Sequence, residues 1–398
     1  MLRRQKSVPA ESVMTDVSRL ELDLSPAGHR SVMLVGRGLL AQAGDLVAEE
    51  AGRKPGERVH LVVDRGPGDV VATHHAAVVE AALRGGGPVS IGMVTATESN
   101  KSLGTVEQGW TDLADAGVDR RGIVVGIGGG IVCDLAGFVA AGWMRGIGLV
   151  LVPTTLLSMV DAGLGGKTGV NRPLPGGGLG KNLVGAFWPA RLVLCDTETL
   201  ETLGEREYRA GLAECVKHGI IEGEETLAAL EADLPGVLGR DPEALPRFVA
   251  RSASVKAAVV ERDFREGGER ALLNLGHTYA HAIESRTEFG LLHGEAVSIG
   301  LVAATTAAAS LGLADPGLAA RIRRMLAGCG LPTRLPDPIP DSKSLLEALR
   351  GAMQLDKKSS GGRLRLVLPV TPGDCRVVAD PDESAVMDGW RAVLGEPG

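Results

Sequence analysis

The sequence predicts two domains: an α/β N-terminal domain of the Rossmann-like type and an all-helical C-terminal domain. The chain has 398 residues, which is long for a single hydrophobic core. Short β-branched runs alternate with helical patterns in the first half, and the strand pattern disappears after about residue 195. We therefore place the α/β domain at residues 19–195 and the helical domain at residues 196–398, after a disordered extension at residues 1–18.

Five apolar, β-branched runs in the first half are expected to form buried strands. Patterns with helical periodicity lie between them, at residues 106–117 and directly after Gly130. Strands that alternate with helices form parallel sheets through right-handed crossovers. The five runs are SVMLVG (31–36), RVHLVVD (58–64), PVSIGMV (88–94), GIVVGIGGG (122–130) and GLVLVPTT (148–155).

The second half of the chain has the spacing of apolar residues that is typical of helices. One exception, RLRLVLP (363–369), is expected to return as a short strand. The predicted helical segments are LAECVKHGII (212–221), LPRFVARSASVKAAVVERD (245–263), HTYAHAIES (277–285) and HGEAVSIGLVAATTAAASLG (293–312).

Composition argues against several classes of protein. A net charge of −7 disfavours a nucleic-acid binder, whose binding face would be basic. The five cysteines are odd in number, scattered and without CxxC spacing, so we expect reduced thiols and a cytoplasmic location. Residues 122–153 are apolar, but Asp134, Arg145 and several glycines interrupt them, which favours buried strands over a membrane span. The N-terminal MLRRQKSVPAESV lacks the apolar core of a secretory signal.

The segment VDAGLGGKTGVN (160–171) places Asp161 and Lys167 among glycines, and Lys181 follows in GKN. Glycine allows main-chain N–H groups to approach an anion closely, because no Cβ intervenes. This pattern suits a lysine that binds a phosphate. Taken alone, it also fits a glycine-rich surface loop with a solvated lysine.

A second glycine-rich segment, GIGGGIVCDLAGF (126–138), lies where a strand is expected to end and a helix to begin. Glycines there expose N–H groups to a pyrophosphate at the positive end of the helix. Asp134 would add an acceptor on the nicotinamide side of a bound dinucleotide. A tight strand–helix turn without any ligand is the alternative. Glu98 and Lys101, three apart in ATESNKS, indicate by themselves only a solvated pair.

Three of the eight histidines, His277, His281 and His293, fall in one short region. Two helices separated by a turn can aim imidazoles at one point, and two histidines with one carboxylate are a usual ligand set for zinc. His277 pairs either with His281, four residues on, or with His293. Glu214 is the candidate carboxylate, with His218 as a rival ligand. For each histidine alone, a hydrogen-bonded core position is the alternative.

Several cations have no evident purpose in an ordinary helical domain. Lys217, Lys256 and Arg270, with Lys167 and Lys181, can form an anion pocket for a substrate that carries both a phosphate and a carboxylate. The acidity of the whole chain makes a local basic cluster more informative. Lys256 also fits an exposed position on a helix.

Taken in order, these segments resemble the 3-dehydroquinate synthase family of sugar phosphate cyclases. The resemblance runs from about residue 31 to about residue 370, and it is specific because several independent motifs occur in the same order. The motifs are RGIGLVLVPTTLLSMVDAGLGGKTGVN, GKNLVGAFWPARLVLCDTETLETL, GLAECVKHG, LLNLGHTYAHAIE and LLHGEAVSIGLV.

The resemblance implies an N-terminal NAD-binding domain, a helical domain that binds zinc or cobalt, a cleft between them, and a homodimer. It also implies that Glu214, His277 and His293 hold the metal, whereas His281 contacts the substrate phosphate. The residues that match the family's NAD site are Asp64, Glu98, Lys101, Gly128, Gly129, Gly130, Asp134, Thr154, Thr155, Lys167, Lys181 and Thr202.

The substrate that the resemblance implies is 3-deoxy-D-arabino-heptulosonate 7-phosphate, a small sugar phosphate. The product is 3-dehydroquinate, formed with loss of phosphate and with NAD regenerated in each cycle. Phosphate contacts match Lys167, Asn182, His281, Lys357 and, from the neighbouring subunit, Arg145; carboxylate contacts match Lys256, Arg270 and Asn274; contacts to the reacting hydroxyls match Asp161 and Lys217.

The sequence departs from the family pattern near the proposed site. Residues 172–180 (RPLPGGGLG) are longer than usual, which predicts a mobile loop, and Ala162-Gly163 replace two serines that are common there. Cyclases of natural-product pathways share such a change and are the main alternative. Arg270, Asn274 and His281 favour the carboxylate substrate. A metal-dependent polyol dehydrogenase and a catalytically silent scaffold are more distant alternatives.

Overall fold

The computed structural model describes residues 17–24, 28–66, 71–174, 179–286, 289–336, 342–359 and 363–394. Most of the expected N-terminal extension, residues 1–16, lies outside this set. The described residues form two compact units. The first comprises those up to Leu203 together with Pro242–Glu261, and the second comprises Gly204–Asp241 together with those from Arg262 onward.

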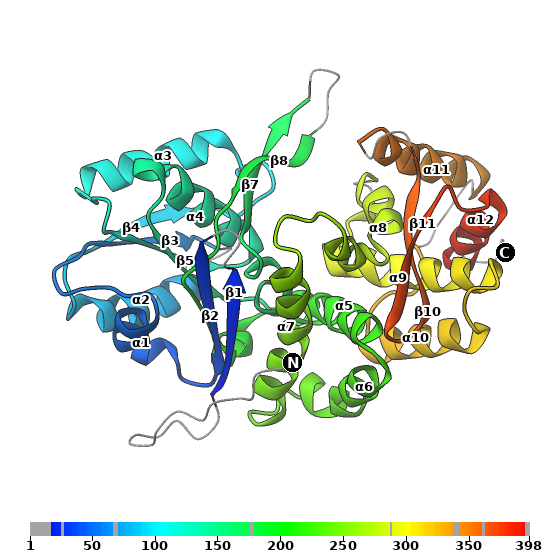
Figure 1. Ribbon diagram of the computed structural model, residues 1–398, viewed down its shortest axis with the longest axis horizontal. Helices are drawn as coiled ribbons and strands as arrows, with labels where there is room; N and C mark the ends of the chain where they lie inside the picture. Colours follow the sequence, from blue (N-terminus) through cyan, green and yellow to red (C-terminus); the bar gives the residue numbers. More distant parts are fainter. Residues whose placement is uncertain are drawn as a thin grey trace. The chain divides into compact units, whose positions relative to one another are not determined.

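The first unit contains a seven-stranded sheet in the order β1-β2-β9-β6-β5-β3-β4. Only the edge strand β1 runs antiparallel to its neighbour, and the other pairings are parallel. All five predicted strands are confirmed (Figure 1). The strands are β1 (Ser18–Leu24), β2 (His29–Gly36), β3 (Val59–Asp64), β4 (Val89–Val94), β5 (Ile123–Gly128), β6 (Gly148–Pro153) and β9 (Leu192–Asp196).

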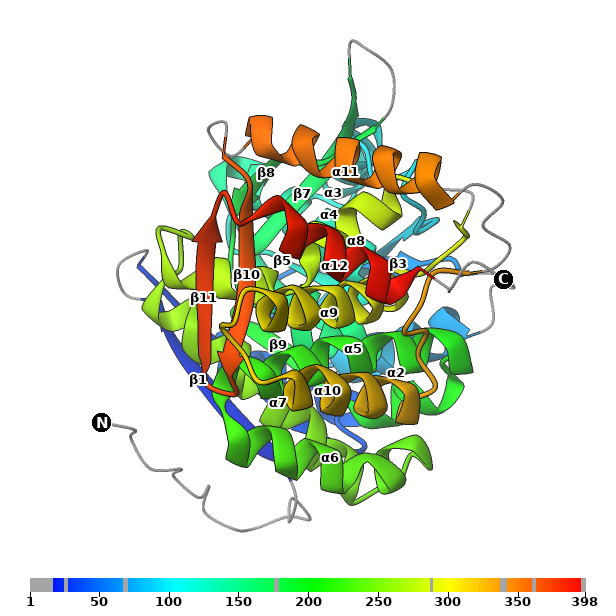
Figure 2. The ribbon, with the colours of Figure 1, turned by 90° about the vertical axis from the view of Figure 1, so that its right-hand side faces the viewer.

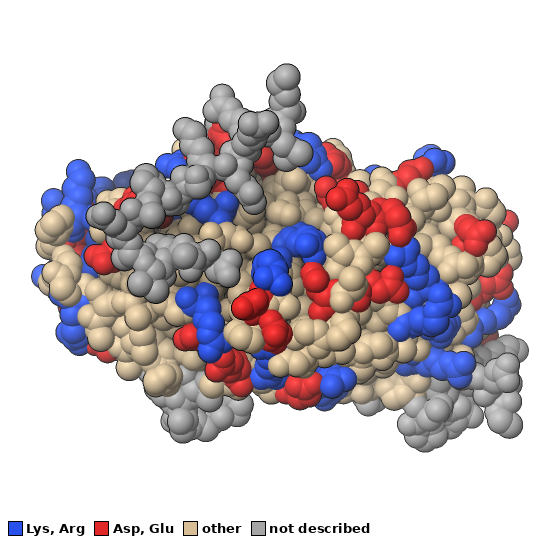
Figure 3. Space-filling view, turned by 90° about the horizontal axis from the view of Figure 1, so that it is seen from below, with Lys and Arg blue, Asp and Glu red and all other residues tan. Residues whose placement is uncertain are grey.

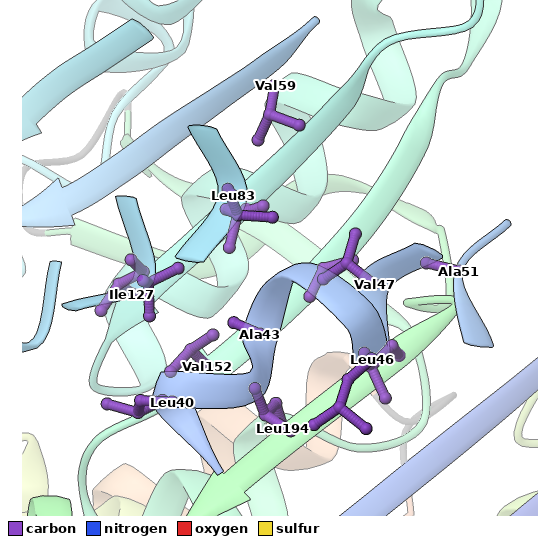
Figure 4. Packing of buried hydrophobic residues seen from close by; sticks show 14 of the residues in the cluster. Leu40, Ala43, Leu46, Val47, Ala51, Val59, Leu83, Ile127, Val152 and Leu194 are labelled. Carbon is purple, nitrogen blue, oxygen red and sulfur yellow. The ribbon is translucent and has the colours of Figure 1, made fainter. Parts of the chain in front are cut away.

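Helices cover both faces of this sheet. On one face, apolar side chains of η2 (Leu40–Gln42), α1 (Ala43–Glu50) and α2 (Val71–Arg84) pack against residues of β2, β3, β5, β6 and β9 (Figure 4). Burial of both faces explains why β5 and β6 are apolar along their whole length. The remaining helices of this unit are α3 (Leu103–Asp115), α4 (Gly130–Gly142), the one-turn η3 (Trp143–Arg145), η4 (Ser158–Ala162), η5 (Thr197–Thr202) and α7 (Ala244–Arg262).

Several elements of the first unit differ from the expectation. The glycine-rich segment with Lys167 is a strand, β7 (Lys167–Pro173), which pairs antiparallel with β8 (Leu179–Phe187). The sequence pattern had indicated neither β1 nor β9. The long insertion predicted to be a mobile loop falls between and within β7 and β8, and its residues 175–178 lie outside the described part of the chain. The sequence assigned α7 to the helical half, whereas almost all of it belongs to the unit that contains the sheet.

The second unit is mainly helical, with α9 at its centre. This helix is rich in Ala and Gly, is buried on nearly every side, and packs against α5, α8, α10 and α12 (Figure 2). The predicted strand at 363–369 is confirmed as β10 (Arg365–Thr371), which pairs with β11 (Asp374–Ala379). The helices are α5 (Glu205–Glu222), α6 (Glu224–Leu238), η6 (Glu269–Asn274), α8 (His277–Glu284), α9 (His293–Ser310), α10 (Pro316–Gly328), α11 (Ser342–Ser359) and α12 (Glu383–Val393).

Acidic and basic side chains are interspersed on the face drawn in Figure 3, without a broad area of one sign. Among the described residues, none of the helices combines the length and the apolarity that a bilayer crossing requires. All five cysteines are free thiols, and four of them are buried.

Candidate functional site

Three potential metal ligands meet in the second unit. Glu214 lies in the middle of α5, and His277 and His293 are the first residues of α8 and α9. One donor atom of each residue lies within 4.8 Å of the other two. The Nε2 atoms of His277 and His293 are each 3.5 Å from Oε1 of Glu214. Two imidazoles and one carboxylate that face a common point form the donor set of a catalytic zinc site.

The two imidazoles are oriented through their other ring nitrogens. Nδ1 of His277 lies 3.2 Å from the carbonyl oxygen of Leu275, and Nδ1 of His293 lies 3.4 Å from Oε1 of Glu284. Because a carbonyl oxygen can only accept, Nδ1 of His277 carries the proton and its Nε2 keeps a lone pair. Such outer contacts fix the tautomer of metal-binding histidines. The sequence analysis did not identify Glu284.

The carboxylate of Glu214 supports the same interpretation. Both of its oxygens are buried, and among the described residues neither makes a hydrogen bond of ordinary geometry. A buried carboxylate in that state is costly unless a cation compensates it. Lys217, one turn along α5, contacts Oε2. The residues present therefore fit a divalent cation.

Electrostatics within this cluster are strongly coupled. Burial raises the pKa of Glu214, but the charge of Lys217 and the two imidazoles outweigh it and hold the pKa well below its ordinary value. Burial, reinforced by Lys217, lowers the pKa of His277 to about 3. Burial also lowers the pKa of His293, but the nearby carboxylates of Glu214 and Glu284 raise it to about 10.

The rival ligands named from the sequence are not part of this group of three. The ring of His281 stands perpendicular to that of His277, with 5.6 Å between the ring centroids. His218 is buried one turn beyond Glu214 on α5 but does not join His277 and His293 among the described donors. Geometry therefore favours the pairing of His277 with His293.

Two of the predicted cationic residues are deeply buried in the second unit. Lys217 is 1% exposed and Arg270 is 2% exposed. Arg270 donates from Nη1 to the carbonyl oxygen of Phe264 at 2.6 Å, while its backbone N–H donates to Asp263 at 3.0 Å. Asn274 is the last residue of the same short helix, η6. Charges are rarely buried this completely unless they are paired or bind a ligand.

The glycine-rich turn predicted to bind a pyrophosphate lies between β5 and α4. Its glycines are required by packing: a Cβ at Gly126 would lie 2.7 Å from Cβ of Ala136, and one at Gly128 would lie 2.7 Å from Val132. Gly129 precedes α4 and offers no side chain to cap it. The first N–H groups of α4 are thus left for another acceptor, as in helix N-termini that bind phosphates.

A buried polar cluster lies beside this turn. Lys101 is 4% exposed, and its ammonium contacts the carboxylate of Asp134 and the side-chain oxygen of Asn182. Burial raises the pKa of Asp134 from 3.8 to about 6, although the charge of Lys101 lowers it. Lys101 is therefore no solvated surface residue, contrary to what its sequence context alone indicated.

Asn171, on β7, is a second residue that the sequence analysis missed. It is 4% exposed, and its side chain bonds both Glu98 and the backbone of Asn182. It thereby connects two of the residues predicted for the site. Asparagine is frequent in turns and loops for purely structural reasons, so its residue type alone did not mark it as part of a site.

Lys256 of α7 forms an ion pair with Asp161 inside the first unit. Its Nζ lies 2.6 Å from Oδ1 and 2.6 Å from the backbone oxygen of Asp161. Lys256 is 7% exposed, so the alternative of an exposed helix position is wrong. Two residues predicted for substrate binding are thus in direct contact.

The other predicted residues belong to both units and differ in their surroundings. Asp64 ends β3 and accepts the N–H groups of Gly66 and Ala96 at 3.0 and 3.2 Å. The side chain of Lys357 lies outside the described part of the chain. Three threonines make hydrogen bonds: the N–H of Thr154 donates to the backbone oxygen of Gly128, the hydroxyl of Thr155 bonds that of Ser158, and the hydroxyl of Thr202 bonds His75. Lys181 lies 3.9 Å from Glu98, and Lys167 is exposed at the start of β7. Arg145 has a left-handed backbone conformation.

Comparison with known proteins identifies the family. The model of the 3-dehydroquinate synthase N-terminal region matches residues 91–210, and that of the C-terminal region matches residues 211–359. A 3-dehydroquinate synthase of Xanthomonas campestris is 46% identical over 88% of this chain and 92% of its own length. One from Symbiobacterium thermophilum is 44% identical over 92% of this chain and 98% of its own length.

Solved structures of related cyclases share the fold. A 2-deoxy-scyllo-inosose synthase, complexed with carbaglucose-6-phosphate, NAD+ and Co2+, has a TM-score of 0.80 and 26% identity, over 95% of this chain and 100% of that one. The 2-epi-5-epi-valiolone synthase of Streptomyces hygroscopicus, with NAD+ and Zn2+ bound, has a TM-score of 0.77 and 25% identity, over 98% and 99%. The family models, the relatives and the fold agree, and the chain therefore belongs to the 3-dehydroquinate synthase family.

Proposed function

We propose that this chain converts 3-deoxy-D-arabino-heptulosonate 7-phosphate to 3-dehydroquinate and phosphate, and is thus a carbon–oxygen lyase that depends on NAD and a metal. The observation that carries the proposal is the group of Glu214, His277 and His293, with its buried carboxylate and oriented imidazoles, in a chain that is 46% identical to a 3-dehydroquinate synthase. A homodimer in the cytoplasm is the expected form of the enzyme.

Glu214, His277 and His293 are the residues that would hold zinc or cobalt. When bound, such an ion polarises a coordinated hydroxyl and lowers its pKa. Around it, Lys217 offers an ammonium beside the ligand Glu214, which suits a donor to a substrate hydroxyl. Asp161 offers a carboxylate that Lys256 keeps in place, and it suits an acceptor from another hydroxyl.

The turn at Gly128–Gly130 and the nearby Asp64, Glu98, Lys101 and Asp134 would hold NAD, which accepts a hydride from the substrate and later returns it. The open N-terminus of α4 suits the pyrophosphate, because its N–H groups are not capped by a side chain. Thr154, Thr155, Lys167, Lys181 and Thr202 complete the proposed dinucleotide site.

The anionic ends of the substrate account for the remaining basic residues. The planar guanidinium of Arg270 suits the carboxylate, because it can donate two parallel hydrogen bonds; Asn274 and Lys256 are proposed to assist it. Several donors on the phosphate would fix the leaving group before it is eliminated, which is a contribution of positioning. These donors are Lys167, Asn182, His281, Lys357 and Arg145, the last from the neighbouring subunit.

Cyclases of natural-product pathways are the second candidate, because two of them share the fold at TM-scores of 0.80 and 0.77. Two observations favour the carboxylate substrate. Identity to those cyclases is 26% and 25%, against 46% to a curated 3-dehydroquinate synthase. Arg270 is present and almost fully buried, as a residue that binds a carboxylate away from water would be.

A substrate panel tests the proposal. Purified enzyme with NAD+ and zinc is offered heptulosonate phosphate or sedoheptulose 7-phosphate, which lacks the carboxylate, and phosphate release is measured. We expect release only from the acid substrate. Arg270→Ala should raise the KM for this substrate by at least about 10-fold and leave the Kd for NAD+ nearly unchanged, because a charge-assisted bond is lost. Turnover of sedoheptulose 7-phosphate alone would overturn the assignment.

A further inference from the structure

The β7–β8 hairpin contains an irregularity at Asn171. Val170 pairs with Val184 and Arg172 pairs with Gly180, so that residues 181–183 of β8 face a single residue of β7. Extra residues of this kind form a bulge, which bends a strand and redirects its side chains. The middle residue of the bulge, Asn182, has φ 56°, a left-handed conformation that asparagine tolerates better than most residues.

The side chain of Asn171 replaces the strand pairing that the bulge interrupts. Its Oδ1 accepts the backbone N–H of Asn182 at 2.9 Å. Its Nδ2 donates to the backbone oxygen of Glu98 at 3.0 Å and to the Glu98 carboxylate at 2.6 Å. Its own backbone N–H donates to the carbonyl oxygen of Lys101 at 2.8 Å. Asn171 thus bonds both the bulge and the segment 98–101 that follows β4.

Lys101 closes this network from the other side, since its ammonium contacts the side-chain oxygen of Asn182. The segment 98–101 and the bulge are therefore connected twice, once through Asn171 and once through Lys101. Both connecting side chains are buried, with exposed fractions of 4% each. In a buried network of this kind, the loss of one member leaves several polar groups unpaired, so the cost exceeds that of one hydrogen bond.

We propose that Asn171 is a positioning residue that holds the segment 98–101 and the bulge of β8 in one arrangement. The inference rests on the proposed function, which assigns Glu98 and Lys101 to the dinucleotide and Asn182 to the substrate phosphate. Loss of Asn171 then weakens the binding of both the dinucleotide and the substrate, although the proposed function assigns Asn171 itself to neither ligand. An amide suits this position, because the contact with Asn182 needs an acceptor and the two contacts with Glu98 need a donor group with two hydrogens.

Asn171→Ala tests the inference, with Thr168→Val as its matched control. Thr168 lies on the same strand, and its hydroxyl donates across the hairpin to the carbonyl oxygen of Ala186 at 2.9 Å. We expect Asn171→Ala to raise the Kd for NAD+ and the KM for heptulosonate phosphate by about 10-fold each, since it leaves buried polar groups unpaired. It should also speed amide hydrogen exchange at residues 96–101 and 179–184. The control should change both constants by less than about 2-fold.

Asn171→Asp separates the two halves of the network. An aspartate keeps the oxygen that Asn182 needs but places a carboxylate against that of Glu98. Exchange should therefore rise at residues 96–101 and stay slow at residues 179–184. Unchanged exchange at residues 96–101 in either Asn171 variant, or equal effects of Asn171→Ala and Thr168→Val, would overturn the inference. Exchange needs no ligand, so it decides the role of Asn171 even if the wild-type enzyme does not turn over heptulosonate phosphate.

Discussion

The imidazole of His293 is oriented by a carboxylate outside the group of proposed metal ligands. Oε1 of Glu284 lies 3.4 Å from Nδ1 of His293, whose Nε2 faces Glu214. An outer carboxylate of this kind orients the ring and makes the ligand nitrogen more basic, and its loss typically costs 10- to 100-fold in metal affinity.

Glu284→Gln should therefore weaken zinc binding by at least about 10-fold, measured by competition with a chromophoric chelator. Glu231→Gln is a suitable control, because Glu231 pairs with Arg321 on an exposed surface of the same unit. An equal affinity of Glu284→Gln and wild type would show that Glu284 does not support the metal.

The raised pKa of Asp134 predicts a pH dependence of stability. Burial raises this pKa from 3.8 to about 6; Lys101 and Lys256 lower it, and Asp161 raises it. The folded chain thus binds the proton more tightly than the unfolded chain. This contribution to stability is complete below about pH 4 and is lost as the pH rises through about 6.

Asp134→Asn should remove this pH-dependent contribution to stability. The free energy of unfolding of the variant minus that of wild type should therefore be larger at pH 7 than at pH 4, by on the order of 2 kcal/mol. Urea unfolding at both pH values measures the difference. If the free energies of unfolding of variant and wild type differ by the same amount at pH 4 and pH 7, the pKa of Asp134 is not raised in the folded chain.

Single residues were predictable from the sequence to different degrees. Glu214, His277 and His293 emerged as candidates from residue types and spacing, but only the family resemblance chose among the possible histidine pairs. Spacing could not decide, because it does not give the angle between α8 and α9. Glu284 and Asn171 had no signal at all, since Glu284 of α8 acts on His293 of the next helix and Asn171 bonds Glu98, 73 residues earlier in the chain.

Among the elements, the turn from β5 to α4 depends most directly on small residues. A Cβ on Gly126 would lie 2.7 Å from Cβ of Ala136, so the helix has to move away from the sheet to admit an alanine. Gly351 in α11 provides the contrast, because nothing lies within 4 Å of its missing Cβ.

Gly126→Ala should lower the free energy of unfolding by about 1–3 kcal/mol, the usual cost of overpacking. Gly351→Ala should raise it by about 0.5–1 kcal/mol, the gain from alanine in a helix. Denaturant unfolding measures both. A neutral Gly126→Ala would mean that α4 does not pack closely on β5.

Of the five strands predicted in the first half, β2, β3, β5 and β6 are almost entirely buried and so appear as apolar runs, whereas the edge strand β4 is partly exposed. β8 lacks such a run, because most of its residues are exposed and two of its nine, Lys181 and Asn182, are polar. The antiparallel edge strand β1 alternates in charge and apolarity, and its pattern was missed as well. The β7–β8 hairpin is held by long-range contacts, such as those of Asn171, that no local pattern reveals.

At the scale of the whole molecule, the chain carries a net charge of −7 yet buries three cations, Lys101, Lys217 and Arg270, at exposed fractions of 4% or less. Buried positive charge is costly and is usually kept for pairing or for binding anions. Two of the three are paired with carboxylates of the chain, Lys101 with Asp134 and Lys217 with Glu214, and the proposed anionic ligands would compensate further positive charge. The order of the motifs along the chain identified the family, which composition and periodicity alone did not.

The proposed reaction uses and restores NAD while phosphate is eliminated. The direct test is a time course with heptulosonate phosphate, zinc and NAD+ at a concentration far below that of the substrate, in which phosphate and NADH are followed together. We predict one phosphate released for each substrate consumed, with no net NADH, and no release by Glu214→Ala. Accumulation of NADH without phosphate release would contradict the account and indicate a simple dehydrogenase.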